Sequence, residues 1–199
     1  MLADVTDSTH FFWELAQAGK SNPKALFDTS CIYSKNMEDI FNMMKRPKDG
    51  IISYLGNTMG DGFILIGKHG HGANHIRRDA PRVLKLAKYV KQECDQRLSQ
   101  AKQKISNVLE RYGAPRELPE METKISLHHG YIVTIMKSRR FFGDTVNYCA
   151  RVASASFKNW NDGIVLTKDF LNIIPFTLRN KVTTKEKVEI TIPYPTKKA

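Results

Sequence analysis

The 199-residue sequence contains little cysteine, no long hydrophobic run and comparatively few acidic residues. Its three cysteines, Cys31, Cys94 and Cys149, are odd in number and widely spaced, which excludes a disulfide framework and the usual zinc motifs. No stretch approaches the roughly 20 apolar residues that cross a bilayer, and no signal-peptide pattern is present. We therefore expect a cytoplasmic protein with reduced thiols and no membrane segment.

The shortage of acidic residues leaves a net charge of +11, from 31 basic and 20 acidic side chains. A charge of this sign permits nucleic acid, an acidic membrane surface or a nucleoside triphosphate as partner. The basic residues are spread over a long helical pattern and the tail, without the interleaved aromatics of a single-strand binder. A solvated basic surface is the simplest interpretation, and no DNA or RNA is expected.

An apolar content of 41% is sufficient for one domain with its own core, and no internal repeat divides residues 1–199. Apolar periodicity and turn residues predict helices at 8–19, 23–44, 79–112, 145–157 and 168–173. Strand-like runs occur at 1–5, 51–55, 63–66, 124–127, 131–135, 164–166 and 188–192. Ser8 and Asp79 are expected to cap their helices, with Pro81 in the first turn of the longest one and Gly19 ending the first.

This order of elements, β-α-β-β-α-β with additions at the C-terminus, predicts an α/β (α+β) fold. The expected architecture is a ferredoxin-like βαββαβ sandwich, in which helices cover one face of an antiparallel sheet. A turn at 47–50 and a Gly- and His-rich loop at 68–78 connect the central elements. His69, His71 and His75 in that loop invite a zinc interpretation, but no fourth ligand follows, so a basic loop is favoured.

Two aspartates are candidate metal ligands. Asp4 ends the first strand and Asp61 occupies the turn of the adjoining hairpin, so the fold could bring both carboxylates together. Hard oxygen ligands on short rigid elements suit Mg²⁺ or Mn²⁺ bound jointly with substrate phosphates. The plainer alternative is that Asp61 is a turn residue and Asp4 a cap.

Residues 139–151 form a tight turn at Gly143-Asp144 followed by a predicted helix. Asn147 and Arg151 are four residues apart, so on a helix they project from one face toward a common ligand. An amide and a guanidinium near a helix N-terminus suit a phosphate. A surface helix with an incidental arginine is the alternative.

Together these segments resemble the class III nucleotidyl cyclases, the adenylate and guanylate cyclase family. Residues 142–151 are similar to its F-G-D-T-V-N-x-A-x-R signature. Three further stretches match in order: 2–9 resembles F-A-D-I-x-G-S-T, 57–62 resembles K-T-x-G-D-G, and 125–130 resembles I-x-x-H-x-G. The four matches span residues 2 to 151.

The resemblance implies conversion of a nucleoside triphosphate to a 3′,5′-cyclic nucleotide and pyrophosphate, with two Mg²⁺ or Mn²⁺ ions per active site. The implied roles are metal binding by Asp4, Val5 and Asp61; wrapping of the triphosphate by Thr6, Asp7, Ser8 and Thr9; ribose orientation by Asn147; stabilisation of α-phosphate charge by Arg151; and triphosphate contact by Lys185 or Lys187.

Two positions depart from the family. The family's adenine-recognising lysine corresponds to Asn57, and the aspartate that acts with it corresponds to Arg140. The glutamate and cysteine that guanylate cyclases usually have at these two positions are also absent. Asn57 donates and accepts, whereas Arg140 only donates, a combination that suits the carbonyl acceptors of uracil or cytosine. We therefore predict a non-standard, pyrimidine base (UTP or CTP), similar to the cyclases of bacterial antiphage signalling. In the alternative, Arg140 contacts phosphate and backbone groups read ATP.

In the family the aspartates and the Asn/Arg pair come from different subunits. A chain that carries both sets implies a homodimer with two equivalent composite sites. Two other functions stay open: a catalytically silent cyclase-like module that binds nucleotide or a partner, and a basic nucleic-acid-binding domain. The latter requires stacking aromatics on its strands, where only Tyr54 and Phe63 are available.

Overall fold

The computed structural model describes residues 1–44, 52–59, 61–68, 72–135, 140–154 and 163–179. Its elements, in chain order, are β1 (Leu2–Val5), α1 (Ser8–Ser21), α2 (Pro23–Met44), β2 (Ile52–Met59), β3 (Gly62–Lys68), α3 (Ala73–Arg111), β4 (Thr123–Leu127), β5 (Val133–Ile135), β6 (Arg140–Phe142), α4 (Asp144–Ser154), β7 (Ile164–Leu166), α5 (Lys168–Ile173) and α6 (Phe176–Arg179). The fold is α+β, as predicted.

The main sheet has the strand order β2-β3-β1-β4-β7. The β1 strand lies antiparallel between β3 and β4, and β2 is antiparallel to β3. This arrangement interlocks two split β-α-β units, which confirms the ferredoxin-like prediction. The additional strand β7 pairs in parallel with β4, so the sheet is mixed rather than purely antiparallel. β5 and β6 form a separate two-stranded ribbon.

Helices cover both faces of this sheet, and the prediction of helices on one face was wrong. Successive side chains of a strand point to opposite faces. In β3, Phe63 and Leu65 join the large core with α1, α2 and α3. Ile64 and Ile66 join a second cluster with residues of α4. Because both faces of β3 are apolar, each needs a helical cover.

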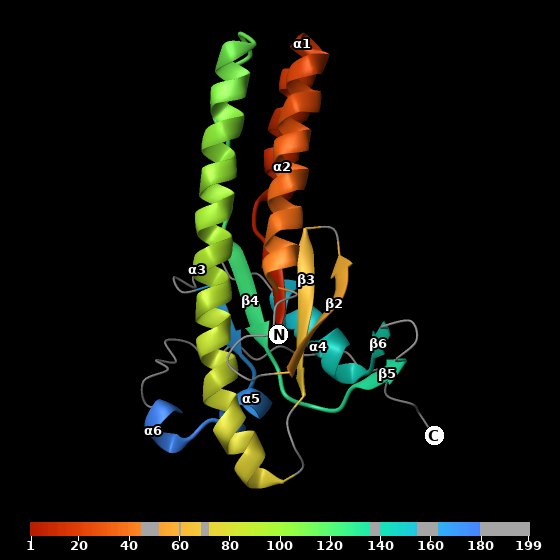
Figure 1. The fold of residues 1–199 in the computed structure, drawn as a ribbon, viewed down its shortest axis with the longest axis vertical. Coiled ribbons are helices and arrows are strands. Elements are labelled where there is room, and N and C mark those ends of the chain that lie inside the picture. The colour runs from red at the N-terminus through yellow and green to blue at the C-terminus, as the bar shows by residue number, and fades with distance from the viewer. Residues whose placement is uncertain (45–51, 60, 69–71, 136–139, 155–162, 180–199) are drawn as a thin grey trace, which may run out of the picture.

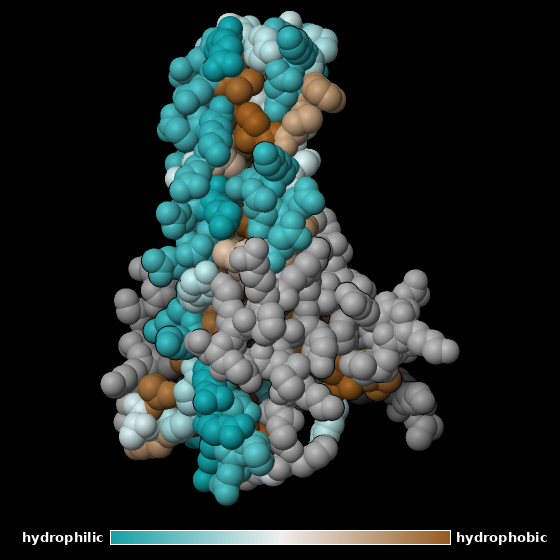
Figure 2. Space-filling view, in the orientation of Figure 1, coloured by the Kyte–Doolittle hydropathy of each residue, from teal (hydrophilic) through white to brown (hydrophobic). Residues whose placement is uncertain are grey.

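The helices α1, α2 and α3 lie side by side and extend well beyond the end of the sheet (Figure 1). The buried stripe of α3 recurs every three or four residues and contains Ala87, Val90, Cys94, Leu98, Ala101, Ile105 and Leu109. The face of this helical part seen in Figure 2 is largely hydrophilic, with hydrophobic side chains near its far end. None of the helices that the structure describes combines the length and apolar character of a membrane span.

The start of α3 and the end of α1 differ from the prediction. The long helix α3 begins at Ala73, so Pro81 lies inside it and Asp79 is not its cap. Instead, the Asp79 carboxylate accepts a hydrogen bond of 3.0 Å from Arg78 Nε on the helix surface. The first helix continues past Gly19, where an added Cβ would lie 2.8 Å from the Leu26 side chain. Gly19 therefore permits close packing of α1 on α2 rather than ending the helix.

Ser8 is the first residue of α1, not its cap, because Asp7 occupies the capping position. Helix α2 has the predicted bounds, and α4 begins at Asp144, one residue earlier than predicted. In the Gly- and His-rich segment, His75 lies in α3, while His69 and His71 lie outside the described residues. The predicted turn at 47–50 and strand at 188–192 also lie outside them.

The three cysteines are unpaired, as predicted. Cys94 and Cys149 are buried, and burial raises the pKa of the Cys94 thiol to about 12. Cys31 is exposed on α2. Only Cys31 is therefore accessible to reagents in solution.

Candidate active site

Asp4 and Asp61 are brought to the same end of the sheet. β1 pairs with β3 in a register that places Leu2 opposite Ile64 and Ala3 opposite Phe63. Continuing this register carries Asp4 to the level of Gly62, next to Asp61. Burial and the charge of Asp61 raise the pKa of Asp4, against the opposing effects of the Val5 N–H and Lys124. The two carboxylates therefore repel each other in the folded protein.

One oxygen of this pair has no partner within the part of the chain that the structure describes. Asp61 Oδ2 is buried without a hydrogen-bond partner there, and so is the Tyr33 hydroxyl. Burial raises the pKa of Tyr33, and the charges of Asp61 and Asp4 raise it further. A buried, unpartnered carboxylate oxygen is costly, and a cation would satisfy it.

The donor set fits Mg²⁺ or Mn²⁺, because both ions prefer hard oxygen ligands. The described residues contain no group of three or more His, Cys, Asp or Glu side chains that could enclose a metal. Two carboxylates are what Mg²⁺ commonly takes from a protein when substrate phosphates supply further oxygens. The pair thus fits a metal shared with a phosphorylated ligand.

The turn after β1 leads directly from Asp4 into the N-terminus of α1. Asp7 adopts a left-handed backbone with φ 54° and ψ 13°, the only positive φ among the described residues other than glycine. Its side chain makes no capping hydrogen bond. The first N–H groups of α1 therefore lack a side-chain cap, and they carry the positive end of the helix dipole. Such a helix start suits an anion.

Asn147 and Arg151 lie on α4, which covers the opposite face of the sheet from α1, α2 and α3. Both residues are exposed, whereas Cys149 and Val152 are buried between them and the sheet. The helix is held by Thr145 Oγ1, which donates to the Tyr131 carbonyl at 2.7 Å. Ser126 Oγ of β4 donates to the Cys149 carbonyl at 2.9 Å. The exposed side of α4 is therefore fixed relative to the sheet.

The structure brings the predicted metal ligands and the predicted phosphate-binding residues, Thr6 to Thr9, into one region. Asn57 lies on β2 at an irregularity between Leu55 and Thr58 in its pairing with β3. Arg140 opens β6, and β6 contacts β2. Lys185 and Lys187 lie outside the described residues. The two positions predicted to recognise the base are thus on strands that contact each other.

No protein-family model and no curated protein matches the sequence. Among solved structures, the chain is similar to an adenylate cyclase from Trypanosoma brucei described in its monomeric state. The match has a TM-score of 0.46 and 15% sequence identity, and it covers 90% of this chain and 77% of that one. A likeness this distant leaves the activity to be argued from the residues of this chain.

Sequence reasoning missed Tyr33 and Lys124. Tyr33 occupies the buried side of α2 together with Thr29 and Met37, where an aromatic residue looks like an ordinary core position. Its hydroxyl was the available signal, because a buried tyrosine usually needs a hydrogen-bond partner. Lys124 pairs with Asp4 in the β1–β4 register, and this neighbour could be recognised only once the strand order was known.

His128, which follows β4, is expected to make the stability of the protein depend on pH. His128 Nδ1 lies 2.9 Å from Thr167 Oγ1 and 3.9 Å from Asp169 Oδ2. Burial lowers the pKa of His128 below its ordinary value of 6.5, against the opposing effect of Asp169. The unfolded chain therefore takes up this proton at a higher pH than the folded protein. We expect the free energy of unfolding to fall as the pH drops below about 6.5.

Urea unfolding at several pH values between about 7.5 and 5 measures this effect. His128→Gln should flatten the curve, because glutamine does not titrate. His10→Gln is the matched control, since the His10 side chain is 59% exposed and its ion pair is with Glu14, one turn along the same helix. An equal pH dependence in wild type and His128→Gln would contradict the prediction.

Proposed function

We propose that the protein is a nucleotidyl cyclase that converts a nucleoside triphosphate to a 3′,5′-cyclic nucleotide and pyrophosphate. The observation that carries this proposal is an Asp61 oxygen, close to Asp4 and to the start of α1, that is buried without a partner among the described residues. A cation site adjoining an anion site suits a metal-bound triphosphate. The resemblance of four ordered segments to class III cyclases supports the same chemistry.

Asp4 and Asp61, with the Val5 backbone, would hold two Mg²⁺ or Mn²⁺ ions. When bound, these ions acidify the ribose 3′-hydroxyl and offset charge on the phosphates. The negative charges of Asp4 and Asp61 also favour binding of the nucleotide together with its metal ions. This role in metal binding explains why the two carboxylates are held close despite their repulsion.

The remaining steps belong to polar groups of this chain. The turn from Thr6 to Thr9 wraps the triphosphate at the α1 N-terminus, with the N–H groups of Asp7, Ser8 and Thr9 as donors, since the Thr6 N–H already donates to the Glu122 carbonyl. Asn147 orients the ribose so that its 3′-oxygen faces the α-phosphorus. Arg151 donates hydrogen bonds to the α-phosphate oxygens, where negative charge develops as the 3′-oxygen displaces pyrophosphate. Lys185 or Lys187 contacts the triphosphate.

Asn147 and Arg151 act across a homodimer interface, so each active site combines the aspartates of one chain with the α4 of another. Two equivalent sites follow from the twofold symmetry of such a dimer. At the base, the neighbouring strands that carry Asn57 and Arg140 offer donors to carbonyl oxygens, which favours UTP or CTP over purine nucleotides.

The first test is a substrate panel. The purified dimer is incubated with ATP, GTP, CTP or UTP and Mn²⁺, and cyclic products are separated by chromatography. We expect one dominant cyclic pyrimidine nucleotide that Asp61→Ala abolishes. Preferential cyclisation of ATP would refute the pyrimidine preference but retain the cyclase. Nucleotide binding without any product from a verified dimer would instead favour the catalytically silent module.

A further inference from the structure

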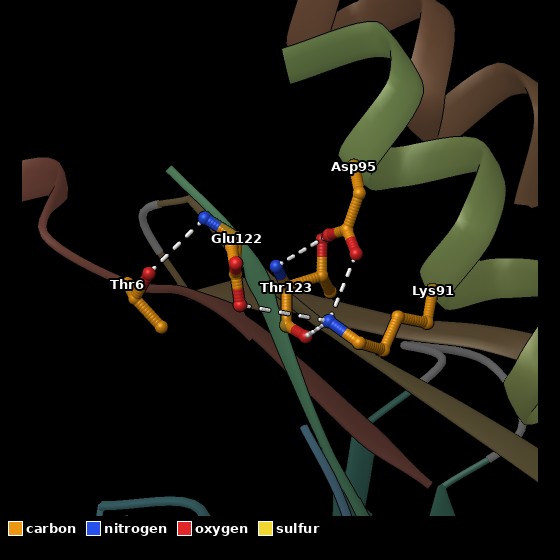
Figure 3. A network of polar contacts seen from close by, with 5 residues as sticks. All are labelled: Thr6, Lys91, Asp95, Glu122 and Thr123. Carbon is orange, nitrogen blue, oxygen red and sulfur yellow. Dashed lines mark hydrogen bonds and ion pairs between the residues drawn. The ribbon is translucent and has the colours of Figure 1, made fainter. Parts of the chain in front are cut away.

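A polar network connects α3 to the proposed phosphate-binding turn (Figure 3). Its centre is Thr123, the first residue of β4. The Thr123 N–H donates to Asp95 Oδ1 at 2.6 Å, and Lys91 Nζ donates to the Thr123 carbonyl at 3.1 Å. Lys91 also donates to Asp95 Oδ2 at 2.8 Å. One ion pair on α3 therefore holds both backbone groups of a single strand residue.

Glu122, the residue before Thr123, connects this network to β1. The Thr6 N–H donates to the Glu122 carbonyl at 2.8 Å, and the Glu122 N–H donates to Thr6 Oγ1 at 3.1 Å. The Glu122 carboxylate also lies 4.0 Å from Lys91 Nζ. The pairing of β1 with β4 thus continues one residue past Val5, with the threonine hydroxyl as the acceptor. This reciprocal pair fixes Thr6 immediately before the left-handed Asp7.

The ion pair is partly shielded from water, since the side chains of Lys91 and Asp95 are 17% and 30% exposed. Gly163 leaves the space that the ammonium occupies, because a Cβ there would lie 2.8 Å from Lys91 Nζ. Its φ of +59° also favours glycine. Gly163, immediately before β7, thereby leaves room for the Lys91 ammonium beside Thr123.

We propose that Lys91 and Asp95 are positioning residues for the triphosphate. Acting through Thr123 and Glu122, they hold Thr6 and so keep the N–H groups at the start of α1 directed at the phosphates. This role rests on the proposed function, because it needs the turn at Thr6 to bind phosphate. Neither residue contacts the substrate itself.

The test compares Lys91→Met with Lys102→Met in the full chain. Methionine keeps the aliphatic stem and removes the ammonium. Lys102 is the matched control because it also joins α3 to the segment before β4, through an ion pair with Glu120, but does not contact Thr123. Lys91→Arg is the conservative variant, and Asp95→Asn is the milder alternative if Lys91→Met does not fold.

Two measurements distinguish a loss of Thr6 positioning from a general destabilisation of α3. Hydrogen exchange measures protection of the Thr6 and Thr123 amides, and calorimetry measures the affinity for pyrophosphate in the presence of Mn²⁺. We expect faster exchange at both amides and about 10-fold weaker pyrophosphate binding in Lys91→Met, the lower range for groups that orient a ligand. Lys102→Met should match wild type, and Lys91→Arg should recover most of the affinity.

Unchanged pyrophosphate affinity in folded Lys91→Met would overturn the positioning role, even if its amides exchanged faster. An equal loss in Lys102→Met would also overturn it, since any weakening of α3 would then suffice. If the wild-type protein bound neither pyrophosphate nor nucleotide, the proposed function would fall and this role with it. Wild-type binding together with unchanged variant affinity overturns the role alone.

Discussion

Asp61→Asn should abolish cyclisation and at the same time raise the stability of the metal-free protein. The substitution removes the repulsion between Asp61 and Asp4 and leaves a neutral amide of the same shape. We expect a gain of about 1 kcal/mol, in the range found when a functional site is neutralised. In a domain of this size that corresponds to about 3 °C in Tm. Loss of activity should exceed about 100-fold, because a metal ligand is lost.

Thermal unfolding in EDTA and in increasing Mn²⁺ measures both effects. The Tm of the wild-type protein should rise with Mn²⁺, since an ion that binds only the folded state stabilises it. The Tm of Asp61→Asn should start higher and respond little. Asp39→Asn, an exposed position on α2, is the control and should behave as wild type. A metal-free Asp61→Asn protein less stable than wild type would contradict the repulsion between Asp61 and Asp4.

Mixing two inactive variants should restore activity. Asp61→Ala lacks a metal ligand, and Arg151→Ala loses about 100-fold in rate with its charge-stabilising guanidinium. If each site combines the aspartates of one chain with the α4 of another, a mixed dimer contains one intact site and one doubly impaired site. Random pairing at equal amounts should then recover about one quarter of wild-type activity.

Differently tagged chains, co-expressed and purified through both tags, isolate the mixed dimer and should yield about half of wild-type activity. The matched control pairs Asp4→Ala with Asp61→Ala. Both substitutions affect the same half-site, so no mixed dimer regains an intact one. Absence of recovery from a verified Asp61→Ala and Arg151→Ala dimer would mean that the two sets of residues act within one chain.

Periodicity was sufficient to predict the helices that pack against the core, but it missed the first turns of α3. The buried stripe of α3 was recognisable from Val90, Cys94 and Leu98 because a helix against a core repeats every three or four residues. The first turns of α3 are mostly exposed, so they carry no stripe and appeared to be a loop. Asp79 looked like a cap only because the apolar pattern starts there.

The sequence contained a signal that both faces of the sheet are buried. Residues 63–66 are continuously apolar, and such a run is typical of a strand buried on both sides. The left-handed Asp7 was not predictable locally, because Ser8 is an equally good cap by residue type. The hydrogen bonds that fix the preceding Thr6 come from Glu122, 116 residues away. Motif order identified Asp4 and Asp61, but only the strand register placed Lys124 opposite Asp4.

The distribution of the three thiols allows the protein to be labelled at one position, Cys31, to follow its assembly. Cys31 is exposed on α2, while Cys94 and Cys149 are enclosed by the two hydrophobic clusters. A maleimide spin label should therefore attach once per chain without any engineered cysteine. In an assembly of two chains, dipolar spectroscopy between the two labels would yield one distance, and its change on adding nucleotide would reveal whether the helices of the two copies move relative to each other.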